Sequence, residues 1–194
     1  MTDRKKGPRR SKADDSRELM VVAGKGDRKA FDQVAKNYAN MVIALAYKML
    51  GSRDDALDCA QDAFVKAWEN ADRYDPKWSV ATWLRRIVTN LSLDRLRKRG
   101  GRVDMSEALE ASIRSDVEGP AEAALRIERA GVVRSVLEAL PEKYRTVLVL
   151  RDMENLDITD ISNITGANPA TVRWRLHRAR ALFRDRWNAI SSEE

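Results

Sequence analysis

The chain has 194 residues, 43% of them hydrophobic and 34% charged, which supports one ordinary folded domain or two small ones. A formal charge of +6 and a pI near 9.6 favour an acidic partner, either nucleic acid or an anionic membrane surface. One cysteine and one histidine exclude an intramolecular disulfide and the common zinc sites, and no apolar run reaches the ~20 residues that span a bilayer.

The basic residues are concentrated in separate segments. Residues 83–102 contain seven Lys or Arg and one acid, Asp94, and residues 168–187 contain six Arg and one acid, Asp185. Between them, residues 100–125 reverse the sign, with six acidic and two basic residues. This pattern predicts two basic binding domains joined by an acidic tether.

The helical pattern begins after a polar and basic stretch, residues 1–16, which we expect to be a disordered tail. This stretch lacks the apolar segment of a secretory signal, so we expect a reducing, bacterial-type cytoplasm. From Arg17 the pattern is helical, and apolar residues recur at three- and four-residue steps between Phe31 and Met49, which is typical of one buried helix face. Gly51 is expected to end this helix in a left-handed cap.

A second helix is predicted to start at Ser52, which forms a capping box with Asp55. Its core-facing residues are predicted to be Ala56, Ala60, Phe64, Ala67 and Trp68. Its outer arc carries Asp54, Asp55, Asp58, Gln61 and Asp62. Cys59 is expected to be a small core residue, with a redox sensor as the alternative.

A loop over residues 70–79 follows, because Pro76 forbids a helix there. Ser79 can cap a third helix that runs to about Arg99. The inward-facing residues of this helix are predicted to be Trp83, Ile87 and Leu91.

Residues 102–124 are polar and Ala-containing, with a breaker at Gly119-Pro120, and are expected to connect the two halves. Helices are predicted over residues 121–140 and 142–153, with Pro141 between them.

A pair of short elements then follows. Asp157 is predicted to cap a short helix that buries three isoleucines and ends at Gly166. Asn168 and Pro169 start the next helix, with a capping side chain followed by proline in the first turn. Two helices joined by so short a turn predict a helix-turn-helix.

The last helix, residues 168–186, is amphipathic. At 100° per residue its narrow apolar stripe contains Val172, Leu176, Ala179, Phe183 and Trp187. Its polar arc is nearly all positive, and Asp185 is the one acid in it. A solvated helix usually mixes in Glu for ion pairs four residues apart, so this arc favours a nucleic-acid surface over a merely solvated face.

Four segments carry a family pattern. They are YKMLGSRDDALDCAQDAFVKAWE (47–69), RYDPKWSVATWLRRIVTNLSLD (73–94), LPEKYRTVLVLR (140–151) and TVRWRLHRAR (171–180). In this order and spacing they resemble the extracytoplasmic-function (ECF) group of bacterial sigma-70 RNA polymerase sigma factors. The resemblance covers about residues 25–100 and 122–187.

The resemblance implies an all-α protein of two small helical domains joined by a flexible acidic linker. Residues 17–100 would be sigma region 2, residues 101–121 the linker, and residues 122–190 sigma region 4 with its helix-turn-helix. The linker would either thread a basic channel of the polymerase or act as a simple tether. The implied partners are core RNA polymerase, through its largest-subunit clamp helices and its beta flap, promoter DNA and an anti-sigma factor.

The resemblance assigns polymerase binding to Asp54, Asp55, Asp58 and Gln61. For Asp54 and Asp55, complementing the helix dipole is an alternative or additional role, because both lie in the first turn.

The −10 element would be melted and read as partly single-stranded DNA, which requires stacking platforms and cations along the backbone. The matching positions are Arg73, Tyr74, Lys77, Trp78, Trp83, Arg85, Arg86, Asn90, Asp94, Arg97, Lys98 and Arg99. Core packing is the alternative for Trp83, and an ordinary basic helix end is the alternative for Arg97, Lys98 and Arg99.

The −35 element would be read as duplex by the last helix, because arginine can bind guanine in a bidentate manner in the major groove. The matching positions are Arg151, Thr171, Arg173, Trp174, His177, Arg178 and Arg180. Arg180 and Arg184 are expected on phosphates. Trp174 replaces a small residue of the family, and either packs on a thymine methyl or shields the DNA backbone.

Two other classes of protein remain to be weighed. A free-standing helix-turn-helix regulator would bind duplex DNA without polymerase, but it leaves the aromatic loop at Trp78 unexplained. An enzyme has no support, because the chain lacks a phosphate-binding glycine loop, a metal cluster and a nucleophile beside His177. We therefore expect no cofactor and no metal.

Overall fold

The computed structural model describes residues 12–98 and 120–191, and in these residues every regular element is helical. The elements are α1 (Lys12–Ala23), α2 (Arg28–Leu50), α3 (Arg53–Glu69), the 3-10 turn η1 (Ala71–Arg73), α4 (Val80–Lys98), α5 (Pro120–Glu138), α6 (Glu142–Leu148), the π-helical turn η2 (Val149–Met153), α7 (Ile158–Thr165) and α8 (Pro169–Ser191). The expected all-α class is confirmed. Among the described residues, no helix has the length and apolarity needed to cross a membrane.

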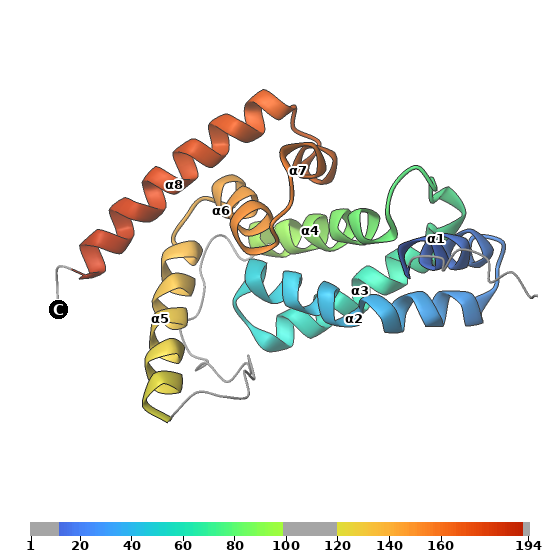
Figure 1. Cartoon of the computed structure of the whole chain (residues 1–194), viewed down its shortest axis with the longest axis horizontal. Coiled ribbons are helices and arrows are strands. Elements are labelled where there is room, and N and C mark those ends of the chain that lie inside the picture. The colour runs from blue at the N-terminus through green and yellow to red at the C-terminus, as the bar shows by residue number, and fades with distance from the viewer. Residues whose placement is uncertain (1–11, 99–119, 192–194) are drawn as a thin grey trace, which may run out of the picture.

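The N-terminal half is a bundle in which α2 packs against α1, α3 and α4 (Figure 1). On α2 the residues predicted for the core are buried, among them Val34, Val42 and Leu45. The buried face of α3 is made largely of alanines, with Cys59 among them, which lets the neighbouring helices approach closely.

The first helix begins earlier than the sequence predicted. Helix α1 starts at Lys12 rather than Arg17, and Ser16 and Met20 are buried in the bundle. A disordered tail to residue 16 is therefore wrong for residues 12–16, while residues 1–11 lie outside the described part. The chain then turns at Gly26, whose φ of 97° favours glycine.

The predicted helix starts are capped as expected. Ser52 Oγ accepts the N–H of Asp55, and Ser79 Oγ accepts that of Thr82. Gly51 ends α2 with a φ of 78°, in the left-handed region.

The buried face of α4 is displaced by one residue from the prediction. Its buried residues are Val80, Leu84, Val88, Thr89, Ser92 and Leu96. Trp83, Ile87 and Leu91 are half-buried and pack at the edge of the core. The reason is that α4 is covered on two sides, by the N-terminal bundle and by α7, so that no single narrow stripe describes its core.

In the C-terminal half the helix predicted over residues 142–153 is interrupted. After Leu148 the chain forms the π-helical turn η2, in which the N–H of Glu154 bonds to the carbonyl of Val149. Such turns are frequent at functional positions. Helices α7 and α8 then follow with a three-residue connection, and Gly166 ends α7 with a φ of 71°.

The two halves are in contact. Helix α7 packs against α4, and α6 lies near the C-terminal end of α4 (Figure 1). The buried hydrophobic residues of both halves form one cluster. The expected linker, residues 101–121, lies outside the described residues except for its last two residues, which begin α5.

Candidate nucleic-acid and polymerase interfaces

The exposed arc of α8 carries the side chains predicted to read duplex DNA. Val172, Leu176 and Ala179 anchor the helix in the core. The exposed residues of its first three turns include Arg173, Trp174, His177 and Arg178. Asn168 Oδ1 accepts the N–H of half-buried Thr171 at 2.8 Å, which caps the helix. One face of the N-terminal half of α8 is therefore fixed in the core, and the opposite face is exposed to solvent. A helix that enters a DNA groove needs such an exposed face.

Trp174 is braced by α6. It is 58% exposed, and its ring centroid lies 6.2 Å from that of buried Tyr144. Lys143 Nζ lies 5.0 Å from the same Tyr144 centroid. Aromatic contacts of this kind contribute about 0.5–1.5 kcal/mol beyond the area that they bury. Trp174 is thus oriented by the protein while most of its surface stays accessible.

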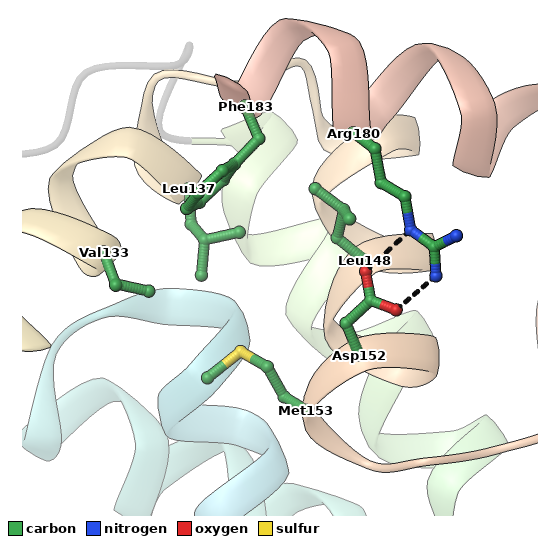
Figure 2. A pocket seen from close by; sticks show the side chains of 7 residues that line it. All are labelled: Val133, Leu137, Leu148, Asp152, Met153, Arg180 and Phe183. Atoms are coloured by element: carbon green, nitrogen blue, oxygen red, sulfur yellow. Dashed lines mark hydrogen bonds and ion pairs between the residues drawn. The ribbon is translucent and has the colours of Figure 1, made fainter. Parts of the chain in front are cut away.

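Two of the arginines predicted to contact the −35 element form intramolecular hydrogen bonds or ion pairs. Arg180 forms a bidentate ion pair with Asp152, with Nε–Oδ2 and Nη2–Oδ1 distances of 3.1 and 2.6 Å (Figure 2). The hydrogen bond to Asp152 raises the pKa of Arg180. Arg151 Nη1 donates to the carbonyl of Leu156 at 2.7 Å. Both arginines therefore hold η2 and the following loop in place.

The loop before α4 buries one of its predicted aromatic residues and exposes the other. Tyr74 is 7% exposed, its hydroxyl donates to the carbonyl of Trp78 at 2.7 Å, and its ring meets that of Trp83 edge-on at 5.4 Å. Trp78 is 43% exposed. The ring of Tyr74 is therefore covered in this conformation, and its contact with DNA stays a prediction. Tyr74 positions Trp78 and Trp83.

An exposed stripe follows α4 at four-residue steps. Its members are Arg86, Asn90, Asp94 and Lys98. Arg73 and Lys77, before the helix, are exposed as well. These six residues, Trp78 and Arg97 are the part of the predicted −10 surface that faces solvent among the described residues. Arg99 lies outside the described residues.

On α4, Arg85 and Arg97 each meet a carboxylate of the C-terminal half, although the side chain of Arg97 stays 63% exposed. Arg85 Nη2 lies 3.4 Å from Glu154 Oε2, and Arg97 Nε lies 3.4 Å from Glu142 Oε2. Arg97 also pairs with Asp94 within α4. The sequence could not indicate these contacts across the two halves.

The outer face of α3 is more apolar than the sequence analysis recognised. Asp54, Asp58 and Gln61 are exposed as predicted, and Asp55 is half-buried. The same face also exposes Leu57 at 43%, Val65 at 51% and Trp68 at 37%. Trp68 was predicted to face the core, but it is 37% exposed, and its ring centroid lies 5.2 Å from that of Phe31. The sequence does contain an indication of this apolar face, because Leu57 and Val65 fall outside the buried alanine stripe of α3.

A pocket of about 220 Å³ lies between α5, η2 and α8 (Figure 2). Its apolar walls are Val133, Leu137, Leu148, Met153 and Phe183. The Asp152–Arg180 ion pair closes one side. Met153 is 41% exposed, so part of the apolar lining is accessible from solvent.

Known families match both halves of the chain. Residues 34–102 match the model of sigma-70 region 2, and residues 131–183 match that of sigma-70 region 4. The ECF RNA polymerase sigma factor SigW of Bacillus subtilis is 36% identical over 168 residues, which are 82% of this chain and 90% of SigW. The chain belongs to the ECF sigma factors. Sigma factors are transcription initiation factors rather than enzymes.

Other ECF sigma factors and solved structures agree with this membership. The ECF sigma-E factor of Escherichia coli is 32% identical over 84% of this chain and 88% of its own length. The structure of CnrH in complex with the cytosolic domain of CnrY superposes with a TM-score of 0.67 and 26% identity, over 91% of this chain and 99% of CnrH. The sigma factor RpoE of Bartonella quintana, solved with the anti-sigma factor NepR, has the same fold, with a TM-score of 0.65 at 22% identity over 82% of this chain and 98% of RpoE.

Proposed function

We propose that this chain binds core RNA polymerase in the bacterial cytoplasm and directs it to promoters by reading duplex DNA at −35 and melted DNA at −10. The observation that carries the proposal is the presence of three separate surfaces on one sigma-family chain. They are the cationic arc of α8, the exposed stripe of α4 with Trp78, and the acidic and apolar face of α3.

The α8 surface suits duplex DNA. Arginine side chains on an exposed, capped helix can reach guanine O6 and N7 in the major groove, and Arg173 and Arg178 are both exposed. Trp174 adds an apolar surface of limited mobility, because Tyr144 braces it. This geometry supports contact with a thymine methyl.

The α4 surface suits unpaired DNA. Trp78 offers a stacking platform, Asn90 can pair with a base edge, and Arg86 and Lys98 can bind phosphates. All four are exposed, whereas the ring of Tyr74 is covered.

The α3 surface and the α8 pocket suit protein partners. An apolar centre of Leu57 and Val65 surrounded by Asp54, Asp58 and Gln61 is the composition expected of a protein interface with a basic rim on the partner. We assign it to the clamp helices of the polymerase. The pocket at Met153 and Phe183 is our assignment for the beta flap.

An anti-sigma factor is a further proposed partner, because the structure of RpoE that has the same fold was solved with one. The chain would then be released for transcription when that partner dissociates.

Reconstitution with core polymerase tests the proposed function. Core polymerase with this chain should initiate from a discrete set of promoters in a run-off assay on genomic fragments, whereas core polymerase alone should not. Specific duplex binding by the chain without any polymerase-dependent initiation would instead identify a free-standing regulator.

A further inference from the structure

Trp174 is an apolar side chain placed among cations. At 58% it is the most exposed of the large apolar side chains in the described part of the chain. Its neighbours on the exposed arc of α8 are Arg173, His177 and Arg178. Single exposed apolar residues are common on protein surfaces. Trp174 differs from them because a second aromatic ring holds it.

The ring that holds Trp174 is itself fixed. Tyr144 is 8% exposed, and its centroid lies 6.2 Å from that of Trp174 at an interplanar angle of 53°. Its helix, α6, packs against α8 (Figure 1). The next residue, Arg145, is buried and donates from Nη2 to the carbonyls of Glu138 and Leu140. Trp174 is therefore oriented before DNA arrives, so it has less conformational entropy to lose on binding.

The same tyrosine ring also contacts a cation. Lys143 Nζ lies 5.0 Å from the Tyr144 centroid, which is within the range of about 6 Å for a cation–π interaction. The side chain of Lys143 is exposed. One buried ring of α6 therefore contacts both the apolar side chain of Trp174 and an exposed positive charge.

These side chains offer a contact that the arginines of α8 do not. In the major groove guanine presents the two acceptors that arginine binds, whereas thymine presents one acceptor and a methyl group. The methyl group is read by apolar contact, which the ring of Trp174 can make. Contacts to phosphates fix the position of a protein on the duplex, and a lysine can bind a phosphate as a point charge.

We propose that Tyr144 is a positioning residue for −35 recognition, which holds Trp174 against the methyl group of one thymine and Lys143 against a phosphate of the same duplex. The inference rests on the proposed function, because it names a base that α8 would read and extends the reading surface to α6. Promoters of this chain should therefore have a thymine at one fixed −35 position, and its methyl group should contribute to affinity.

Replacement of thymine by uracil tests the methyl contact, because it removes the methyl group and keeps the acceptor of the base. Each thymine in the −35 element of a promoter found in the run-off assay is replaced in turn. The measurement is the affinity of the holoenzyme, which is core polymerase with the full chain. Affinity should fall about fourfold at one position, the equilibrium equivalent of one buried methyl group. A loss at no position would overturn the proposal.

Variants of the protein assign that loss to Trp174. With Trp174→Ser, promoters with thymine and with uracil at this position should bind equally. With Tyr144→Leu the preference should fall to less than about twofold, because Trp174 is no longer held, whereas Tyr144→Phe keeps the ring and should keep the full preference. A preference that survives Trp174→Ser would overturn thymine reading. So would a loss that Trp174→Ser causes equally on every sequence, which would indicate shielding of the DNA backbone.

Lys143→Met removes the charge and keeps an apolar side chain against Tyr144. It should weaken binding to the thymine and uracil promoters alike, and reduce the slope of log affinity against log salt concentration by about one. Lys29→Met makes the same change at an exposed position of α2 and should leave the slope unchanged. An unchanged slope with Lys143→Met, or an equal change with Lys29→Met, would overturn the phosphate contact.

A measurement without DNA tests the positioning role by itself. In the full chain labelled with fluorotryptophan, Trp174→Phe identifies the fluorine resonance of Trp174 among those of the five tryptophans. Tyr144→Leu should shift and narrow this resonance, because a mobile ring averages its surroundings, and Tyr144→Phe should leave the line narrowing absent. No change with Tyr144→Leu would overturn the positioning role.

The two kinds of failure are distinguishable. If no promoter is found, the proposed function fails and thymine reading fails with it, while the fluorine resonance still decides whether Tyr144 holds Trp174. If transcription is promoter-specific but uracil replaces every −35 thymine without loss, only thymine reading is refuted.

Discussion

At the scale of single residues, exposure and internal ion pairing together distinguish the side chains proposed to read DNA from those that support the fold. Arg173 and Arg178 point outward from α8, whereas Arg180 is held by Asp152 and Tyr74 is covered by its own loop. From residue type alone, all four positions were equally good candidates for contact with DNA. The side chains that remain open are those on which sequence-specific DNA contacts are to be tested first.

Arg178→Ala tests base reading by α8. Loss of a bidentate contact should cost about 1–3 kcal/mol at one −35 base position and relax the preference there. The measurement is holoenzyme affinity for a set of −35 variants, with exposed Arg184→Ala as the phosphate-type comparison. A loss of equal size on every sequence would reassign Arg178 to the DNA backbone.

Cys59 should be chemically inert in the native protein. It is fully buried with its Sγ 3.5 Å from Ser92 Oγ, and burial raises the pKa of the thiol, so less thiolate is present at neutral pH. Native protein should therefore react with a thiol reagent far more slowly than protein unfolded in denaturant, at the same pH. Equal rates would favour a redox sensor.

At the scale of elements, α3 has one face that packs in the core and one face that is exposed to solvent. Its alanine face lets the helix pack closely in the bundle, and its outer face combines acids with exposed Leu57 and Val65. Because the outer residues contribute little to the core, they can be changed without unfolding the bundle. That separation makes the polymerase contact testable by itself.

Asp58→Arg should weaken binding to core polymerase, because it reverses a charge beside the apolar centre of the α3 surface. Binding of the C-terminal half to −35 duplex and the free energy of unfolding should both stay near wild-type values. Asp32→Arg, an equal charge reversal at an exposed position of α2, is the control. If both variants bind polymerase as the wild type does, α3 is not the docking surface.

At the scale of the whole molecule, two proposed DNA surfaces are carried by one chain whose halves also contact each other. The ion pairs at Glu154 and the hydrogen bonds from Arg134 and Arg145 to the end of α2 give that contact defined partners. The two proposed DNA surfaces, on α4 and on α8, therefore belong to one molecule and can be tested together.

Promoter spacing tests this bipartite reading. Adding five base pairs between the −35 and −10 elements turns one element about half a helical turn relative to the other, so transcription should fall sharply in run-off assays. Adding ten base pairs restores the helical face but not the distance, and should recover less than the original spacing. Unchanged transcription with both insertions would mean that only one element is read.

The sequence by itself determined the helices, most of their ends and the outward arc of α8. Ser52, Ser79 and Asn168 cap their helices as predicted because each bonds to a backbone N–H three residues away, and such local geometry follows from residue type and spacing. The same locality explains the buried faces of α2 and α8, which repeat along one helix.

Only the tertiary structure decided which of the candidate functional side chains form ion pairs within the protein. Arg85 and Glu154 are 69 residues apart, and Lys48 and Glu154 are 106 apart, so no periodicity could pair them. The same holds for the core of α4, which α7 covers from the other half of the chain. Local spacing specifies a helix and its apolar and polar faces. Burial and ion pairing depend instead on which other helix packs against each face, and this packing is set by the fold of the whole chain.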